Sequence, residues 1–296
     1  MKHFTIITLM LLCALAAGST AARGQENVAT QVATVYRPQT DTVEVQSTKM
    51  KRGIKNVVVV PVQYYAGPAS EHYPVLYLLH GAWGSYRDWP RKAPLEQLAT
   101  QYGVIIVCPD GQDSWYFDSP IDPTMQFETY VSKELVSYID SHYRTYPTPY
   151  MRAIAGLSMG GHGALWLAWR HPDTFNSCGS MSGGVDITKF PGNWKIKDRL
   201  GKYEDNPQLW ASHAVINLVP SLQPGQHITI DDGYDDIFYQ VNLALHQALM
   251  ERKIPHDFTI RPGKHTWDYW VNSLDYQMLF FSKAFKANAQ HCQQAK

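Results

Sequence analysis

The chain has 296 residues, of which 45% are hydrophobic and 18% are charged, which suits one sizeable core in an α/β domain. The 26 basic and 26 acidic residues give a formal net charge of zero, and no dense basic run is present. This balance argues against nucleic acid or an anionic membrane surface as a partner. No Cys/His spacing is typical of zinc, so we expect neither a metal nor another cofactor.

The N-terminus has the pattern of an export signal. A short basic start precedes an apolar segment over residues 4–17, which is too short to span a bilayer comfortably, and small residues follow it. We therefore expect residues 1–24 to be a signal peptide that is removed. The mature protein is then exported to the periplasm or the cell exterior, with no membrane contact after cleavage.

Removal of the signal leaves three cysteines. Cys108 and Cys178 each lie in an apolar run that resembles a strand, where a buried free thiol is ordinary. Cys292 lies in a polar tail and is expected to be a free surface thiol. Export permits disulfides, but three cysteines give no disulfide framework.

The first predicted elements are two valine-rich strands, residues 41–46 and 55–62. The turn at residues 50–53 lets them pair antiparallel at the edge of a sheet. Residues 74–80 form an apolar run without alternation, which is typical of a parallel strand covered on both faces.

Strand and helix patterns then alternate to the end of the chain, which predicts a mostly parallel, doubly wound α/β sheet with helices on both faces. The pattern predicts a single domain over residues 25–296, with an irregular, cap-like insertion at about residues 185–221. The predicted strands are 103–109, 152–155, 175–182, 227–231 and 257–260, and the predicted helices are 94–102, 126–143, 164–169, 241–252 and 269–284.

A nucleophile-elbow pattern, Gly156-x-Ser158-x-Gly160, lies between a predicted strand and a predicted helix. The turn that presents such a serine is too tight for side chains beside it, and glycine removes the clash. The alternative is a glycine-rich turn with an incidental serine. The strand before it and the helix after it favour a nucleophile.

A serine hydroxyl needs a base to take its proton and a third group to orient that base. In this architecture an acid and then a histidine follow the serine, each after a later strand. His265 follows the last predicted strand and is the candidate base for Ser158; a surface-loop histidine is the alternative. The acid remains open among Asp231, Asp232 and Asp236, since aspartate also favours turns and helix caps.

The oxyanion hole should use backbone N–H groups. Met159 follows the nucleophile and supplies the first. The second is expected from the loop after an earlier strand, where Ala82 follows His80 and Gly81.

Several motifs in order resemble one known family, the esterase D-like putative esterases of the α/β-hydrolase superfamily. This family includes the feruloyl and acetylxylan esterases of carbohydrate esterase family 1, S-formylglutathione hydrolases and mycolyltransferases. The resemblance covers about residues 73–280. The motifs are His80-Gly81 with Trp89, Pro109-Asp110-Gly111 with Trp115-Tyr116, Gly156-Leu157-Ser158-Met159-Gly160-Gly161, and Pro262-Gly263-x-His265-x-Trp267 with Trp270.

The resemblance implies an α/β-hydrolase fold with Ser158 as nucleophile and His265 as base. It implies Asp236 as the acid, the last residue of a Cys-Gly-x-x-Asp pattern. This chain has Asp232 where that cysteine commonly stands.

Export points away from S-formylglutathione hydrolase, whose substrate is cytosolic. The secreted, aromatic-rich members are similar to enzymes that remove feruloyl or acetyl groups from plant cell-wall xylan. We therefore expect an acylated polysaccharide or a small ester as substrate. The candidate substrate contacts are Trp83, Trp115, Tyr116 and the insertion, with plain packing as the alternative for Trp115.

Two other functions are compatible with the same motifs. An acyltransferase would pass the acyl group to a sugar alcohol instead of water. A carbohydrate-binding module would use the scaffold without turnover, although it would not need an intact set of Ser158, Asp236 and His265. Nothing in the sequence indicates an oligomeric state.

Overall fold

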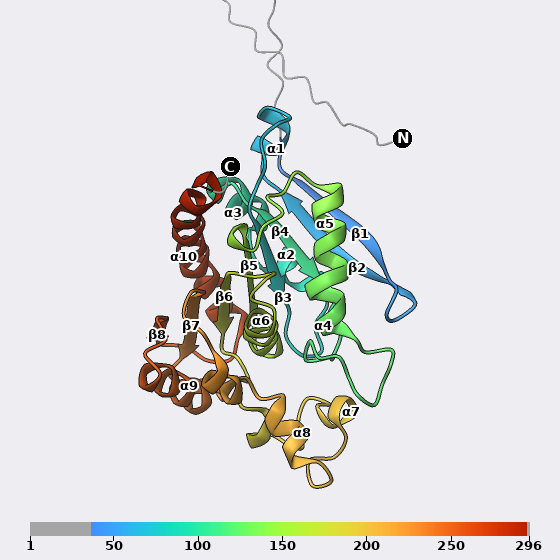
Figure 1. Ribbon diagram of the computed structural model, residues 1–296, viewed down its shortest axis with the longest axis vertical. Helices are drawn as coiled ribbons and strands as arrows, with labels where there is room; N and C mark the ends of the chain where they lie inside the picture. Colours follow the sequence, from blue (N-terminus) through green and yellow to red (C-terminus); the bar gives the residue numbers. More distant parts are fainter. Residues whose placement is uncertain (1–36, 295–296) are drawn as a thin grey trace, which may run out of the picture. The chain divides into compact units, whose positions relative to one another are not determined.

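The computed structural model describes residues 37–294 (Figure 1), and residues 38–294 belong to one unit. The predicted signal peptide lies outside the described residues, as does the side chain of Cys292. Cys108 and Cys178 are buried free thiols, as predicted.

The described residues form an eight-stranded sheet in the order β1-β2-β4-β3-β5-β6-β7-β8. β1 pairs antiparallel with β2, and β2 with β4, while the pairs from β4 through to β8 are parallel. The predicted fold class and its antiparallel N-terminal edge are confirmed. The strands are β1 (Gln39–Ser47), β2 (Arg52–Val60), β3 (Val75–Leu79), β4 (Ile105–Pro109), β5 (Arg152–Leu157), β6 (Ser177–Met181), β7 (His227–Gly233) and β8 (Asp257–Arg261).

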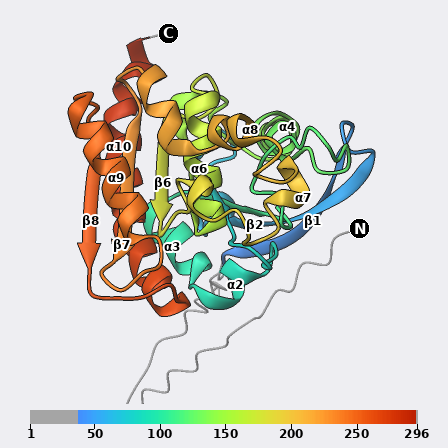
Figure 2. The same ribbon diagram turned by 90° about the horizontal axis from the view of Figure 1, so that it is seen from below.

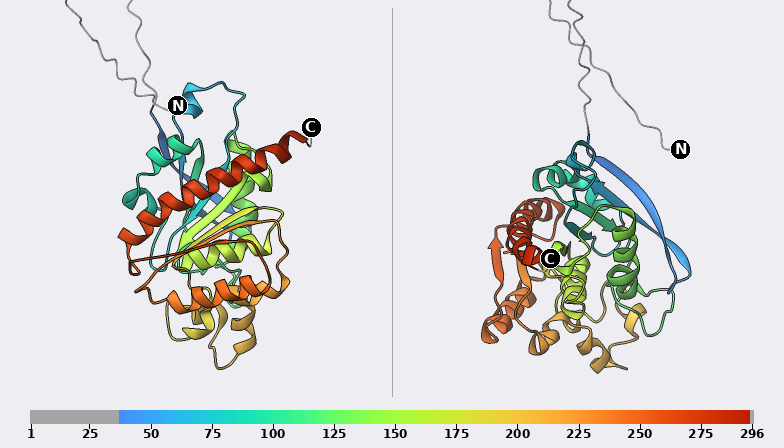
Figure 3. Two further views of the ribbon diagram at one scale, coloured as in Figure 1. Left: turned by 90° about the vertical axis from the view of Figure 1, so that its left-hand side faces the viewer. Right: turned by 45° about the horizontal axis from the view of Figure 1, so that its top comes forward.

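Helices cover both faces of the sheet. One hydrophobic cluster joins the sheet to α4, α5, α6 and α9, and a second joins it to α2, α3 and α10. Figure 3 shows α10 running across its face of the sheet. The helices are α1 (Gln63–Ala66), α2 (Asp88–Lys92), α3 (Leu95–Tyr102), α4 (Phe127–Thr129), α5 (Val136–His142), α6 (Met159–Arg170), α9 (Tyr239–Glu251) and α10 (Trp267–Gln294).

Three helices differ from their predictions. α6 begins at Met159, before the predicted start at residue 164. The expected helix over residues 126–143 contains a π-helical segment, Tyr130–Leu135, between α4 and α5. α10 continues to Gln294, beyond the predicted end at residue 284. Its last residues are rich in alanine, lysine and glutamine, whose high helix propensity extends the helix after its apolar face has ended.

The insertion at residues 185–221 contains four short helical segments that pack into the first hydrophobic cluster through Ile196, Leu200, Trp210 and Val215. α7 and α8 lie at the end of the molecule opposite α1, and Figure 2 looks onto that end. The segments are η3 (Ile187–Lys189), α7 (Lys197–Leu200), α8 (Pro207–Ser212) and η4 (Val215–Ser221).

Ser158 forms the turn between β5 and α6 with φ 55° and ψ −119°, a conformation that L residues rarely adopt. The turn requires close backbone approach on both sides. A Cβ on Gly156 would lie 2.5 Å from the carbonyl oxygen of Gly160, and one on Gly160 would lie 2.6 Å from that of His80. Glycine at both positions therefore permits the elbow.

We expect Gly156→Ala to lower the free energy of unfolding by about 1–3 kcal/mol, because its new methyl group would meet rigid backbone and not a movable side chain. Urea unfolding measures the change. Gly192→Ala is the control, since a Cβ there meets nothing within 4 Å and is expected to leave stability unchanged or slightly raised. Equal effects of the two substitutions would contradict this account of the elbow.

Candidate active site

Ser158, His265 and Asp236 come together in one hydrogen-bonded series. His265 lies in the loop after β8, and its Nε2 is 2.9 Å from Ser158 Oγ. Its Nδ1 lies 2.9 Å and 3.0 Å from the two carboxylate oxygens of Asp236, in the loop after β7. The three side chains come from the carboxyl ends of three parallel strands, as the sequence predicts.

The partners of His265 fix its tautomer. An ionised carboxylate only accepts hydrogen bonds, so Nδ1 carries the proton and donates a hydrogen bond to Asp236. The lone pair of Nε2 then faces Ser158 Oγ and accepts its hydrogen bond. This arrangement can remove the hydroxyl proton as the serine attacks.

Of the three candidate acids, only Asp236 reaches the histidine. Asp231 instead accepts hydrogen bonds from Tyr269 and Ser273 and pairs with Arg261 at 2.7 Å. These contacts tie the tip of β7 to α10 and β8, so Asp231 has a structural role.

Asp232 is also committed elsewhere. It accepts hydrogen bonds from the N–H of Gly233 and from Asn242 Nδ2, each at 2.8 Å. The Phe238 N–H donates to Asp236 Oδ1, and both carboxylate oxygens of Asp236 lie within hydrogen-bond distance of His265 Nδ1.

The two expected oxyanion donors belong to the start of α6 and to the loop after β3. Met159 is the first residue of α6, so its N–H has no acceptor within the helix and lies at the positive end of the helix dipole. Ala82 lines the same cavity as Ser158.

His80 orients the peptide group that joins Gly81 to Ala82. Its Nδ1 lies 2.7 Å from the Gly81 carbonyl oxygen, which also accepts from the Gly84 N–H at 3.2 Å. In a trans peptide the N–H points away from the carbonyl, so the Ala82 N–H is held on the opposite side. The Gly111 N–H donates to His80 Nε2 at 2.8 Å, which leaves the ring proton on Nδ1.

The series opens into a cavity of about 480 Å³. Its walls are largely aromatic, with one carboxylate, and its lining includes Trp83, Asp88, Trp194, Thr266, Trp267 and Trp270. A cavity of this kind suits an uncharged substrate with apolar faces.

Comparisons with known proteins identify the family. The family model described as "Putative esterase" matches residues 47–281. The chain belongs to this family. An "Acetyl esterase" of Caldicellulosiruptor saccharolyticus is 29% identical over 245 residues, covering 76% of this chain and 91% of that protein.

Two further proteins are similar to this chain. A solved "ferulic acid esterase" has a TM-score of 0.74 at 27% identity and covers 85% of this chain and all of its own. The "Diacylglycerol acyltransferase/mycolyltransferase Ag85A" of Mycobacterium gordonae is 34% identical over 160 residues, which is 51% of this chain and 44% of that protein. This member of the esterase family is a carboxylic ester hydrolase.

Two of the three expected substrate contacts are wrong. Trp115 is 1% exposed and Tyr116 is fully buried, and neither lines the cavity. Both have left-handed backbone conformations that turn the rings inward, where Trp115 packs against His162 and Tyr116 against His80. Trp83 does line the cavity and is 72% exposed.

Three cavity tryptophans were not among the predicted contacts. Trp267 and Trp270 follow His265 at short spacing, and this proximity in sequence was the available signal. Trp194 lies within the insertion, which was predicted to face the substrate without naming a residue.

Other features concern the described residues as a whole. No group of His, Cys, Asp and Glu among residues 37–294 is arranged to hold a metal ion. Within the same range no helix combines the length and apolar character needed to cross a membrane.

Burial and the neighbouring charge of Asp236 raise the pKa of Asp232 to about 8, with burial the larger cause. An unperturbed aspartate has a pKa of 3.8. Between these pH values the folded protein holds a proton on Asp232 that the unfolded chain releases. The stabilisation that the folded state gains from the protonated Asp232 is therefore complete below about pH 4 and is lost as the pH rises toward 8.

We expect Asp232→Asn to remove this pH dependence. The difference in free energy of unfolding between variant and wild type should move in favour of the variant as the pH rises from about 4 to 8. Urea unfolding at several pH values measures it. Asp235→Asn, in an exposed neighbour, is the control, and a difference for Asp232→Asn that stays constant with pH would contradict the assignment.

Proposed function

We propose that this protein is an exported serine carboxylesterase that removes feruloyl or acetyl groups from plant cell-wall polysaccharide through an acyl-enzyme. The observation that carries the proposal is the series Ser158–His265–Asp236 at the mouth of an aromatic cavity. The predicted signal peptide at residues 1–24 supports export.

In the first half-reaction, Ser158 Oγ attacks the ester carbonyl while His265 Nε2 takes its proton. Negative charge develops on the carbonyl oxygen, where the N–H groups of Met159 and Ala82 stabilise it. Asp236 stabilises the imidazolium. His265 then returns the proton to the leaving alcohol as the C–O bond breaks, which leaves an acyl group on Ser158.

In the second half-reaction, water replaces the alcohol. His265 takes a proton from the water as its oxygen attacks the acyl carbonyl. The same two N–H groups stabilise the second tetrahedral intermediate. Its collapse releases the carboxylic acid and returns the proton to Ser158 Oγ, so the enzyme regains its starting state.

The substrate class is supported by the cavity and the relatives together. A volume of about 480 Å³ far exceeds an acetyl group and leaves room for a ring on either side of the ester. The relatives include an acetyl esterase and a ferulic acid esterase. Aromatic walls favour flat, apolar faces such as those of a phenol or a sugar.

Ser158→Ala tests the mechanism. We expect kcat for a chromogenic short-chain ester to fall by roughly 10⁴–10⁶-fold, because the nucleophile is removed while the fold remains. Asp236→Asn should cost about 10⁴-fold, and the exposed neighbour Asp235→Asn, its matched control, should leave the rate nearly unchanged. Full activity of Ser158→Ala would end the proposal.

A turnover panel of methyl ferulate, acetylated xylan and methyl butyrate tests the substrate class, because all three esters release an unactivated alcohol. We expect a higher kcat/KM for methyl ferulate or acetylated xylan than for methyl butyrate, because the cavity gives the ring of the natural ester additional contacts. A preference for methyl butyrate over both would contradict the polysaccharide assignment.

Acyl transfer is the second candidate, favoured by the identity of 34% with the mycolyltransferase. It differs only in the second half-reaction, where a sugar alcohol attacks in place of water. Product analysis with and without an added acceptor separates the two reactions. A new ester that forms at the expense of the free acid would establish transfer.

A further inference from the structure

The loop over residues 110–117 is more than a connection after β4. Gln112, Trp115 and Tyr116 have φ values of 47°, 57° and 60°, in the left-handed region that bulky residues avoid. Each such residue costs about 1–3 kcal/mol and persists only where its surroundings hold it. Backbone strain of this density tends to accompany a functional constraint.

Asp113, within this loop, joins two segments that are distant in sequence. Its Oδ1 accepts the backbone N–H of Trp83 at 2.6 Å, and its Oδ2 pairs with Lys195 Nζ at 3.0 Å. The carboxylate is largely covered, while the lysine is about half exposed. One side chain therefore bridges the loop after β3 and the insertion.

Each of the two bridged segments also contains residues with left-handed backbone conformations. Trp83 has φ 59°, and Trp194 and Lys195 have φ 47° and 57°. Trp115 adds a second tie, because its Nε1 donates to the Trp194 carbonyl oxygen at 3.1 Å. The loop thus holds two tryptophans in conformations that neither would adopt alone.

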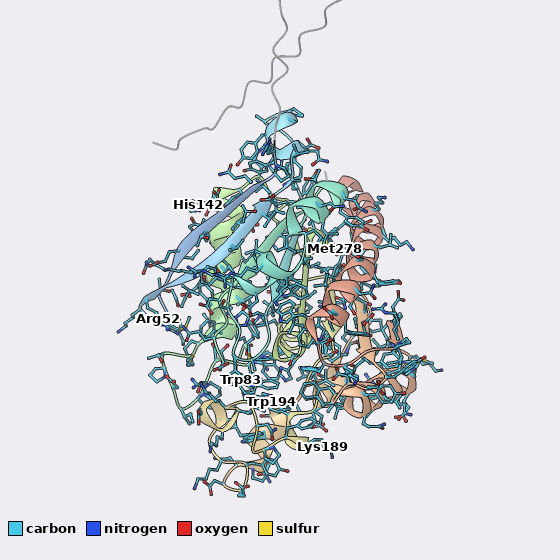
Figure 4. The ribbon with its side chains drawn as sticks, turned by 180° about the vertical axis from the view of Figure 1, so that it is seen from behind. Arg52, Trp83, His142, Lys189, Trp194 and Met278 are labelled. Carbon is cyan, nitrogen blue, oxygen red and sulfur yellow. The ribbon has the colours of Figure 1, made fainter. Side chains whose placement is uncertain are left out.

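Trp83 and Trp194 line the same cavity as Ser158. Figure 4 labels both residues, Trp83 in the loop after β3 and Trp194 within the insertion. The Trp83 ring is 72% exposed, so packing against the protein does not explain its placement. Trp194 packs against Phe238 with the two rings tilted by 56°, and the Phe238 ring also contacts His265.

We propose that Asp113 is a positioning residue that sets Trp83 and Trp194 as the walls of a subsite for an uncharged ring of the ester. The inference rests on the proposed function and extends it to named residues. The cavity lining contains the carboxylate of Asp88 and no lysine or arginine, which disfavours an anionic ring. The ring belongs either to the acyl group or to the sugar alcohol, and the experiment separates these sources.

The test compares three esters on wild type, Asp113→Ala and Trp83→Ala. Methyl ferulate carries the ring on the acyl side, a methyl O-acetyl-xyloside carries it on the alcohol side, and methyl butyrate has no ring. We expect both variants to raise KM for one ring-bearing ester about fivefold to tenfold more than for methyl butyrate, with kcat changing equally for both esters. The ester that responds identifies the side on which the ring binds.

Binding provides a readout that does not depend on turnover. In a Ser158→Ala background, calorimetry with methyl ferulate and with the acetyl-xyloside should show the same fivefold to tenfold weakening when Asp113→Ala or Trp83→Ala is added. Asp113→Asn keeps an acceptor for the Trp83 N–H but loses the ion pair, so it should recover part of the affinity. A purely structural role would not give this selective change.

Asp122→Asn is the matched control. Asp122 pairs with Arg199 at 2.9 Å and likewise joins the segment after β4 to the insertion, but neither residue lines the cavity. We expect it to leave the ratio of KM values unchanged. The exposed ring of Trp83 can be removed without disturbing the fold. The inference would be overturned if Trp83→Ala changed neither the ratio of KM values nor the binding. Absence of wild-type turnover with intact, Trp83-dependent binding would overturn the proposed hydrolysis alone.

Discussion

The tight turn at Ser158 is the constraint on which the site depends. Its left-handed backbone lifts the hydroxyl away from β5, and the turn closes only because glycines bring α6 against the end of β3. The same approach brings the loop after β3 to the serine, since a Cβ on Gly81 would lie 2.7 Å from Leu157 Cδ1. The nucleophile and the oxyanion loop are therefore placed by the same close packing between α6 and the ends of β3 and β5.

A second layer of contacts fixes what the turn brings together. The loop over residues 110–117 binds the oxyanion segment through the Gly111 N–H to His80, through Asp113 to the Trp83 N–H, and through the Tyr116 hydroxyl to the His80 carbonyl oxygen. The first contact sets the ring that orients the Ala82 peptide, and the second sets the wall beside it. The strained loop over residues 110–117 therefore helps to place both the Ala82 N–H, which faces the developing negative charge, and the cavity wall at Trp83. We regard this loop as part of the site.

The sequence predicts the parts of this site that depend on local signals. Short patterns around Ser158 and His265 predict the elbow and the apolar strands. They also predict that an acid and then a histidine follow the serine, each after a later strand. The choice of acid does not follow from these local patterns, and only the family resemblance indicates Asp236, because the choice depends on Tyr269, Ser273 and Asn242 of α10 and α9 occupying the other two carboxylates. The sequence also could not decide between packing and substrate contact for Trp115, because its burial depends on the backbone conformation and not on composition.

The aspartates at the end of β7 and in the loop after it show how the net negative charge of a buried site is kept small. Asp231 is neutralised by Arg261, and the pKa of about 8 keeps Asp232 mostly protonated at neutral pH. Asp236 is then the carboxylate that faces His265 with its charge uncompensated by another residue of this cluster. Two buried carboxylates side by side would repel each other and would compete for the same imidazolium. A single anion, aligned with Nδ1, stabilises the imidazolium that forms during acyl transfer while holding one tautomer beforehand.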